Sequence, residues 1–205
     1  ATMVVGPRER YEAAVRAGKP CLFLAADLVN AHNEFSRVDA QNEIMRLADE
    51  DPRLEPLVRA HAVLGDTDSP ILARDPGTRQ PQLLTHSCAG GGQGNALTCL
   101  VFPITINIHL KRVSSMSTAP FGEPGHVEVL GIQDDVTMVG DPDRIVHGIG
   151  TTPSAMHVLE SGLAESGLKC NKPKFQGLAV NFDGTTLPDW LRQPYETTDT
   201  LRREE

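Results

Sequence analysis

The spacing of apolar positions predicts a chain that mixes helices and strands. Residues 7–17 have the period of an amphipathic helix, and residues 39–50 and 54–64 have the same 3.6-residue period. The apolar run of residues 21–26 has the length of a buried strand, and it delivers Asp27 at its carboxyl end.

Two hairpins and a long helix are expected in the middle of the chain. Residues 69–86 fit two edge strands around an Asp-Pro-Gly turn. Residues 127–139 fit a second hairpin, which would carry Asp134 and Asp135 at its tip. Between the hairpins, residues 95–112 follow a glycine-rich stretch and form a long apolar run that favours a helix.

The last part of the folded region is predicted to be a helix followed by a strand. Thr152 before a proline is typical of a helix start, the helix would end near Ser166, and residues 175–182 fit a strand. Helices and strands without strict alternation favour an α+β fold, an antiparallel sheet with helices packed on one face. We expect one domain over residues 1–182 and a polar C-terminal tail over residues 183–205.

Length, charge and cysteines narrow the functional classes. The 205 residues suffice for a sizeable core. The net charge of −8 argues against a free-standing nucleic-acid binder, which usually has a basic surface. The cysteines form no Cys-x-x-Cys pair, so reduced thiols are favoured over a zinc site or disulfides. The apolar segment of residues 96–110 is too short and too polar to span a bilayer, and the chain does not begin with a signal-peptide pattern. We therefore expect an intracellular protein without a membrane partner.

Three carboxylates are candidates for a metal site. Asp27 ends a core strand, while Asp134 and Asp135 stand between two apolar strands. Carboxylates repel one another and are costly to bury, and a divalent cation offsets both penalties. Oxygen ligands suit Mg²⁺, and two such ions form the clamp used in phosphoryl transfer. The alternative for the Asp-Asp pair is an ordinary exposed turn.

Two further segments are candidates for binding phosphate. Residues 89–95 (AGGGQGN) lack the Lys-Ser/Thr of a P-loop, but backbone amides before a long helix favour phosphate; the alternative is a flexible connection. Lys169, Lys172 and Lys174 hold three of the chain's five lysines within six residues, and the alternative here is a solvated charged stretch.

Four segments, taken in order, resemble the palm of a reverse transcriptase, particularly of retrotransposons without long terminal repeats. Residues 21–33 (CLFLAADLVNAHN) are similar to the strand with the family's first catalytic aspartate. Residues 92–97 (GQGNAL) are similar to its QGDPL motif, and residues 131–140 (GIQDDVTMVG) to its YxDD hairpin. Residues 167–174 (GLKCNKPK) are similar to its GLxxNxxK segment. One such motif is weak, but four in the right order are fairly specific.

The resemblance implies an RNA-directed DNA polymerase with a palm-like antiparallel sheet. It implies that Asp27, Asp134 and Asp135 hold two Mg²⁺ ions, which activate a primer 3′-hydroxyl and stabilise the departing pyrophosphate. Lys174 would neutralise phosphate charge or act as a general acid toward pyrophosphate. The implied partners are an RNA template, a DNA primer and a deoxynucleotide.

The nucleotide pocket is where the chain departs from the family pattern. The resemblance implies that Gln93 and Gly94 line this pocket. His32 stands where the family has an aromatic residue that screens the sugar 2′-position. Ile132 replaces the aromatic residue before the aspartate pair, and Asn95 begins the pair that replaces the usual Asp-Pro. None of these changes removes a metal ligand.

The short length and the acidic charge keep other functions open. With most of the fingers and the thumb missing from these 205 residues, we expect the catalytic middle of a larger polymerase, inactive as an isolated chain. The alternative is a degenerate reverse-transcriptase-like domain that serves as a non-catalytic structural or interaction subunit beside other protein subunits. A metal-dependent nuclease or nucleotide-binding module is a third class that no residue specifically favours.

Overall fold

A four-stranded antiparallel sheet in the order β4-β5-β1-β6 organises the fold. The computed structural model describes residues 2–65, 69–91, 96–120, 123–132, 135–182, 187, 188 and 191. The strands of the sheet are β1 (Cys21–Asp27), β4 (Val127–Ile132), β5 (Asp135–Gly140) and β6 (Gln176–Val180). The predicted α+β fold around an antiparallel sheet is confirmed.

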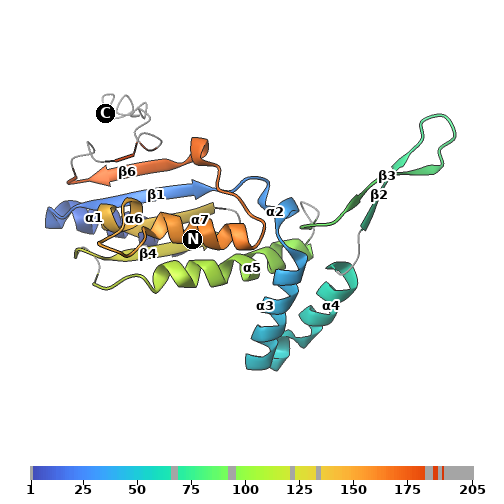
Figure 1. Ribbon diagram of the computed structural model, residues 1–205, viewed down its shortest axis with the longest axis horizontal. Coiled ribbons are helices and arrows are strands. Elements are labelled where there is room, and N and C mark those ends of the chain that lie inside the picture. Colours follow the sequence, from blue (N-terminus) through green and yellow to red (C-terminus); the bar gives the residue numbers. More distant parts are fainter. Residues whose placement is uncertain are drawn as a thin grey trace.

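The helices lie around this sheet, and a separate hairpin projects from them. The helical elements of the described residues are α1 (Thr2–Ala17), α2 (Ala31–Glu34), α3 (Arg37–Glu50), η1 (Pro52–Leu54), α4 (Glu55–Gly65), α5 (Ala96–Ser114), α6 (Pro142–Val146), α7 (Ala155–Glu165) and η2 (Lys172–Lys174). Figure 1 shows the two-stranded hairpin of β2 (Ser69–Arg74) and β3 (Pro81–Ser87) extending away from the sheet, beyond α4. The turn residue Asp75 accepts hydrogen bonds from the backbone of Gly77 and Thr78 at 2.8 and 2.7 Å, which confirms the expected Asp-Pro-Gly turn.

The main core lies between one face of the sheet and two long helices. Leu22, Leu24 and Ala26 alternate along β1, are at most 2% exposed, and pack in one cluster with residues of α5 and α7. By length and composition, α5 is the one helix of the described residues that could cross a membrane. Its Phe102 and Ile106 are at most 1% exposed within this cluster, as expected for a core helix.

The opposite face of the sheet is partly open, which corrects two predictions. The strand over residues 21–26 is buried along one face, while its other face is buried at Cys21 but exposed at Ala25. The helices do not all pack on the other face, because Ala14 of α1 forms a second apolar cluster with Cys21, Val139 and Val180. The side chains of an apolar run this short do not say which face a neighbouring helix will cover.

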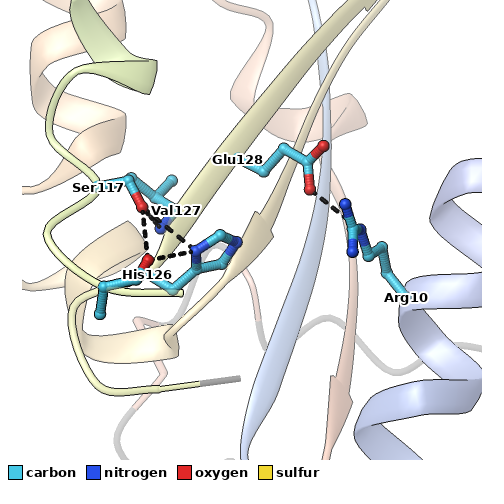
Figure 2. A network of polar contacts seen from close by, with 6 residues as sticks. Arg10, Ser117, His126, Val127 and Glu128 are labelled. Atoms are coloured by element: carbon cyan, nitrogen blue, oxygen red, sulfur yellow. Dashed lines mark hydrogen bonds and ion pairs between the residues drawn. The ribbon is translucent and has the colours of Figure 1, made fainter. Parts of the chain in front are cut away.

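Polar contacts fasten α1 and the chain before β4 to this sheet. Figure 2 shows Arg10 of α1 reaching Glu128 of β4, with 3.2 Å between Nε and Oε2. Nearby, Ser117 Oγ accepts a hydrogen bond from the Val127 backbone at 3.2 Å, and His126 Nδ1 lies 2.9 Å from the Ala119 carbonyl. These contacts hold the first residues of β4 in register beside β5.

Helix starts in the last third of the chain differ from the prediction. Ser154 rather than Thr152 caps α7, because its Oγ accepts from the His157 backbone at 3.1 Å. Thr152 instead forms an isolated bridge with Ile149. The sequence does not predict the helix α6, since its five residues are fewer than the roughly 11–18 over which a helical period can be recognised.

His109 makes the packing of α5 on α7 sensitive to pH. The side chain is 3% exposed, and a Cβ on Gly162 would lie 2.7 Å from its Nδ1, so the helices meet closely here. Nε2 lies 2.8 Å from Ser166 Oγ. Burial lowers the pKa of His109, with a smaller lowering from Arg112.

We therefore expect the free energy of unfolding to fall as pH drops from 7 to 5.5. The lowered pKa means that His109 in the unfolded chain takes up a proton near pH 6.5, while folded His109 does not. The stability that neutral His109 contributes is therefore fully present above that pH and is lost as the pH falls below it. Urea unfolding at several pH values should show a smaller pH slope for His109→Asn than for the wild type. The exposed-site variant His86→Asn should keep the wild-type slope, and an unchanged slope in His109→Asn would contradict the prediction.

Candidate functional site

Two of the predicted metal ligands face each other across paired strands. The register of β1 and β5 places Asp27 directly opposite Asp135, although 108 residues separate them in the chain. Directly opposite residues have Cβ atoms about 4.5–5.5 Å apart, so both carboxylates can reach one cation. The Asp27 side chain is 28% exposed and Asp135 is exposed. Two hard oxygen donors that remain open to solvent fit a divalent cation such as Mg²⁺.

The acidic pair is arranged differently from the prediction. Asp135 does not stand in a turn but begins β5, where it pairs with both Asp27 and Ile132. Pairing on both sides extends the strand to this residue. Asp134 lies outside the described residues, as do Gln93 and Gly94. Within the part of the chain that the structure describes, no three His, Cys, Asp or Glu side chains form a metal-binding group.

A segment between α7 and β6 packs against the end of β1 and supplies two donors to Asp27. Asn171 Nδ2 donates to Asp27 Oδ2 at 2.9 Å, and Lys174 Nζ lies 3.5 Å from the same oxygen. Lys174 is a predicted site residue, whereas Asn171 is not. Asn171 does stand in the GLKCNKPK motif, so the sequence contained a hint of its role. That its side chain bonds Asp27, however, follows only from the pairing of distant segments.

The lysine cluster is not simply a solvated stretch. Lys174 reaches Asp27, and Lys172 pairs with Glu160 of α7 at 2.9 Å. Cys170, which lies between Lys169 and Lys172 in the chain, is half-buried, and burial raises the pKa of its thiol to about 12. That thiol is therefore neutral near pH 7, and Cys170 is a free cysteine in this structure.

His32 lies on the short helix α2, which follows β1. The preceding Asn30 has a left-handed backbone (φ 47°), which turns the chain from the strand into the helix. The half-buried His32 ring packs on Phe102, with ring centroids 4.9 Å apart. Phe35, the residue that follows α2, packs on the Phe102 ring as well, with ring centroids 5.9 Å apart. The position predicted to screen a sugar is thus held against the core.

The chain that leads to the glycine-rich segment is bound to α2. The Gly90 backbone donates to the Phe35 carbonyl at 2.8 Å, and Gly91 donates to the His32 carbonyl at 2.7 Å. A Cβ on Gly90 would lie 2.3 Å from the carbonyl carbon of Asn33, and φ there is +59°, so only glycine fits. This contact places residue 91 beside α2, one residue before the predicted nucleotide motif.

Arg37 fixes the same loop from the start of α3. Its guanidinium donates to the carbonyls of Gly90, Ser87 and Ala89 at 2.7, 3.0 and 3.2 Å, and to Ser87 Oγ at 2.9 Å. A guanidinium presents several donors in a rigid fork, which suits this set of acceptors. No role for Arg37 is predicted from the sequence, because its acceptors lie about fifty residues away in the chain.

Comparison with known proteins supports the fold but does not assign a family. No protein-family model matches the chain, and no curated protein matches it. Among solved structures, the fold is similar to apo telomerase from Candida tropicalis truncated from its C-terminal domain, with a TM-score of 0.56 and 11% identity over 90% of this chain and 36% of that one. It is also similar to telomerase from Candida tropicalis in complex with a fragment of telomeric RNA, with a TM-score of 0.55 and 12% identity over 87% of this chain and 29% of that one.

These similarities define the class of fold. The chain has a reverse-transcriptase-like fold, similar to that of part of these telomerase chains. It spans about a third of the length of the telomerase chains that it resembles.

Proposed function

We propose that the chain is the palm of an RNA-directed DNA polymerase, which transfers nucleotides to a primer 3′-hydroxyl. One observation carries this proposal: Asp27 and Asp135 lie opposite each other on adjacent strands of the sheet. The reverse-transcriptase-like fold supports it, because the four sequence motifs independently resemble the same family and occur in its order. The motifs point more specifically to the type found in retrotransposons without long terminal repeats.

The donor set is suited to two Mg²⁺ ions, which would be held by Asp27, Asp135 and Asp134. Such ions supply positive charge at the attacking and leaving oxygens of a phosphoryl transfer. Asp27 and Asp135 bring their carboxylates together from paired strands, so their separation is set by the sheet rather than by a loop. A site built on strands holds its geometry more tightly than one built on loops.

The remaining residues of the site would bind the nucleotide. The Lys174 side chain is 68% exposed and its ammonium lies beside Asp27, where it can neutralise a phosphate or supply a proton to pyrophosphate. His32 would contact the sugar, and Gln93 and Gly94 would line the pocket for the base. The polynucleotide partners would be an RNA template and a DNA primer, and one of the similar telomerases was solved in complex with RNA.

Primer extension tests this proposal. A DNA primer on an RNA template should be extended with Mg²⁺ and deoxynucleotides by the complete product of this gene, and Asp134→Ala should abolish extension. Parallel reactions on a DNA template show whether RNA is preferred. Extension by Asp134→Ala at the wild-type rate, or no extension by the complete product, would refute it.

The second candidate is a non-catalytic interaction subunit with a reverse-transcriptase-like fold. The projecting β2–β3 hairpin favours it, because Ile71, Leu72, Leu83 and Leu84 are 44–65% exposed there. Exposed apolar side chains gathered on one element are typical of protein interfaces. Under this function the chain co-purifies with a stable partner, and Asp134→Ala leaves that association intact.

A further inference from the structure

Asn171 is bound to Asp27 by its backbone as well as by its side chain. The Asn171 backbone N–H donates to the Asp27 carbonyl at 2.8 Å, and the Val29 backbone N–H donates to the Lys169 carbonyl at 2.8 Å. Leu28 and Cys170 form an isolated antiparallel bridge between these two hydrogen bonds. The two short segments are thus paired like strands, and the pairing places Asn171 directly beside Asp27.

The side chain of Asn171 then acts on one particular oxygen. Its Nδ2 donates to Asp27 Oδ2 at 2.9 Å, and Lys174 Nζ approaches that same oxygen at 3.5 Å. The amide is neutral, so it orients the carboxylate without cancelling its charge. With Oδ2 engaged by both neighbours, Oδ1 is the oxygen available to a cation.

We infer that Asn171 is a positioning residue for a divalent cation site: it fixes the rotation of the Asp27 carboxylate so that Oδ1 is presented as the metal ligand. This inference rests on the proposed function, since it takes Asp27 to be a metal ligand. Hydrogen bonds to ligating carboxylates orient them, and removing such a partner typically weakens metal binding 10- to 100-fold. Because this site is partly open to solvent, we expect the low end of that range.

The backbone pairing makes the side chain separable from the fold. The hydrogen bond from the Asn171 N–H to Asp27 and the bridge of Leu28 with Cys170 do not involve the Asn171 side chain. Asn171→Ala should therefore keep the two segments paired and remove only the contact to Oδ2. Asn171→Ser keeps a short side-chain donor and should retain part of the effect.

Binding of Mn²⁺ to this chain, followed by the loss of the free-ion electron paramagnetic resonance signal, tests the inference without any polymerase assay. We expect Asn171→Ala to raise the dissociation constant for Mn²⁺ about ten-fold, Asn171→Ser to raise it less, and both to keep the wild-type unfolding midpoint. Lys172→Ala is the matched control, because Lys172 lies one residue away but pairs with Glu160. Wild-type Mn²⁺ affinity in Asn171→Ala, or an equal loss in Lys172→Ala, would overturn the inference. A loss of affinity accompanied by a matching drop in the unfolding midpoint of both Asn171 variants would also overturn it, since the residue would then be structural.

A further variant separates this inference from the proposed function. If the wild type binds Mn²⁺ more tightly than Asp27→Asn but no more tightly than Asn171→Ala, the inference fails and the metal site stands. If the wild type binds Mn²⁺ no better than Asp27→Asn, the proposed metal function itself fails.

Discussion

Asp27→Asn is expected to lower Mg²⁺-dependent primer extension by about a thousand-fold while leaving the chain folded. A divalent cation contributes several kcal/mol of charge stabilisation to phosphoryl transfer, and about 4 kcal/mol corresponds to three powers of ten in rate. The substituted amide keeps the shape of the side chain and its acceptor for Asn171, but it lacks the negative charge that a cation requires. Single-turnover extension by the complete gene product, together with Mn²⁺ binding to this chain, measures the effect.

The fold should tolerate this substitution for two reasons. Asp27 lies opposite a like charge at Asp135, so removing its charge relieves a cross-strand repulsion. The ion pair with Lys174 is lost, but Lys174 is 68% exposed, and exposed pairs contribute about 0–1 kcal/mol. The unfolding midpoint should therefore stay within a few degrees of the wild-type value.

Asp143→Asn is the matched control for Asp27→Asn. Asp143 is an exposed acidic residue in the first turn of α6, outside the candidate site. Its substitution removes the same charge and should leave both extension and Mn²⁺ affinity unchanged. Extension by Asp27→Asn within a few-fold of the Asp143→Asn rate would show that the Asp27 carboxylate is not a metal ligand.

The elements that sequence predicted well are those whose signal is local. The Asp-Pro-Gly turn at residues 75–77 defines the β2–β3 hairpin, since a carboxylate two residues before a glycine bonds its own turn. The long apolar run of α5 and the shorter run that ends at Asp27 are equally local. These features needed no knowledge of what packs against them.

The parts that sequence missed depend on contacts between distant residues. Asn171 meets Asp27 across 144 residues, and Arg37 meets the Gly90 carbonyl across 53. Neither partner can be read from spacing along the chain. The position of α1 on the open face is of the same kind, because it follows from the second apolar cluster around Ala14 rather than from the helix's own pattern. The sequence could therefore indicate candidate residues for the site, but not which neighbour orients each of them.

The candidate site and the main core share one aromatic contact. Phe102 of α5 is fully buried, and it packs against His32 of α2, the helix that follows Asp27, and against Phe35, which directly follows that helix. A change at this core position should therefore act in two places, on global stability and on the placement of α2.

Phe102→Ala is expected to lower the free energy of unfolding by about 3–5 kcal/mol. Truncating a fully buried aromatic side chain removes its transfer free energy and leaves a cavity that its neighbours fill only in part. Since a domain is typically stable by about 5–15 kcal/mol, this one change removes a large share of the total. Urea unfolding followed by circular dichroism measures it.

Leu100→Ala provides the comparison on the same helix. Leu100 is 60% exposed and only two residues from Phe102, so its truncation opens no cavity and should change stability by at most about 0.5 kcal/mol. Equal losses for the two variants would contradict the placement of α5, because that result requires both side chains to be equally buried. In Phe102→Ala alone the His32 ring loses its packing partner, so under the proposed function nucleotide binding should weaken in that variant but not in Leu100→Ala.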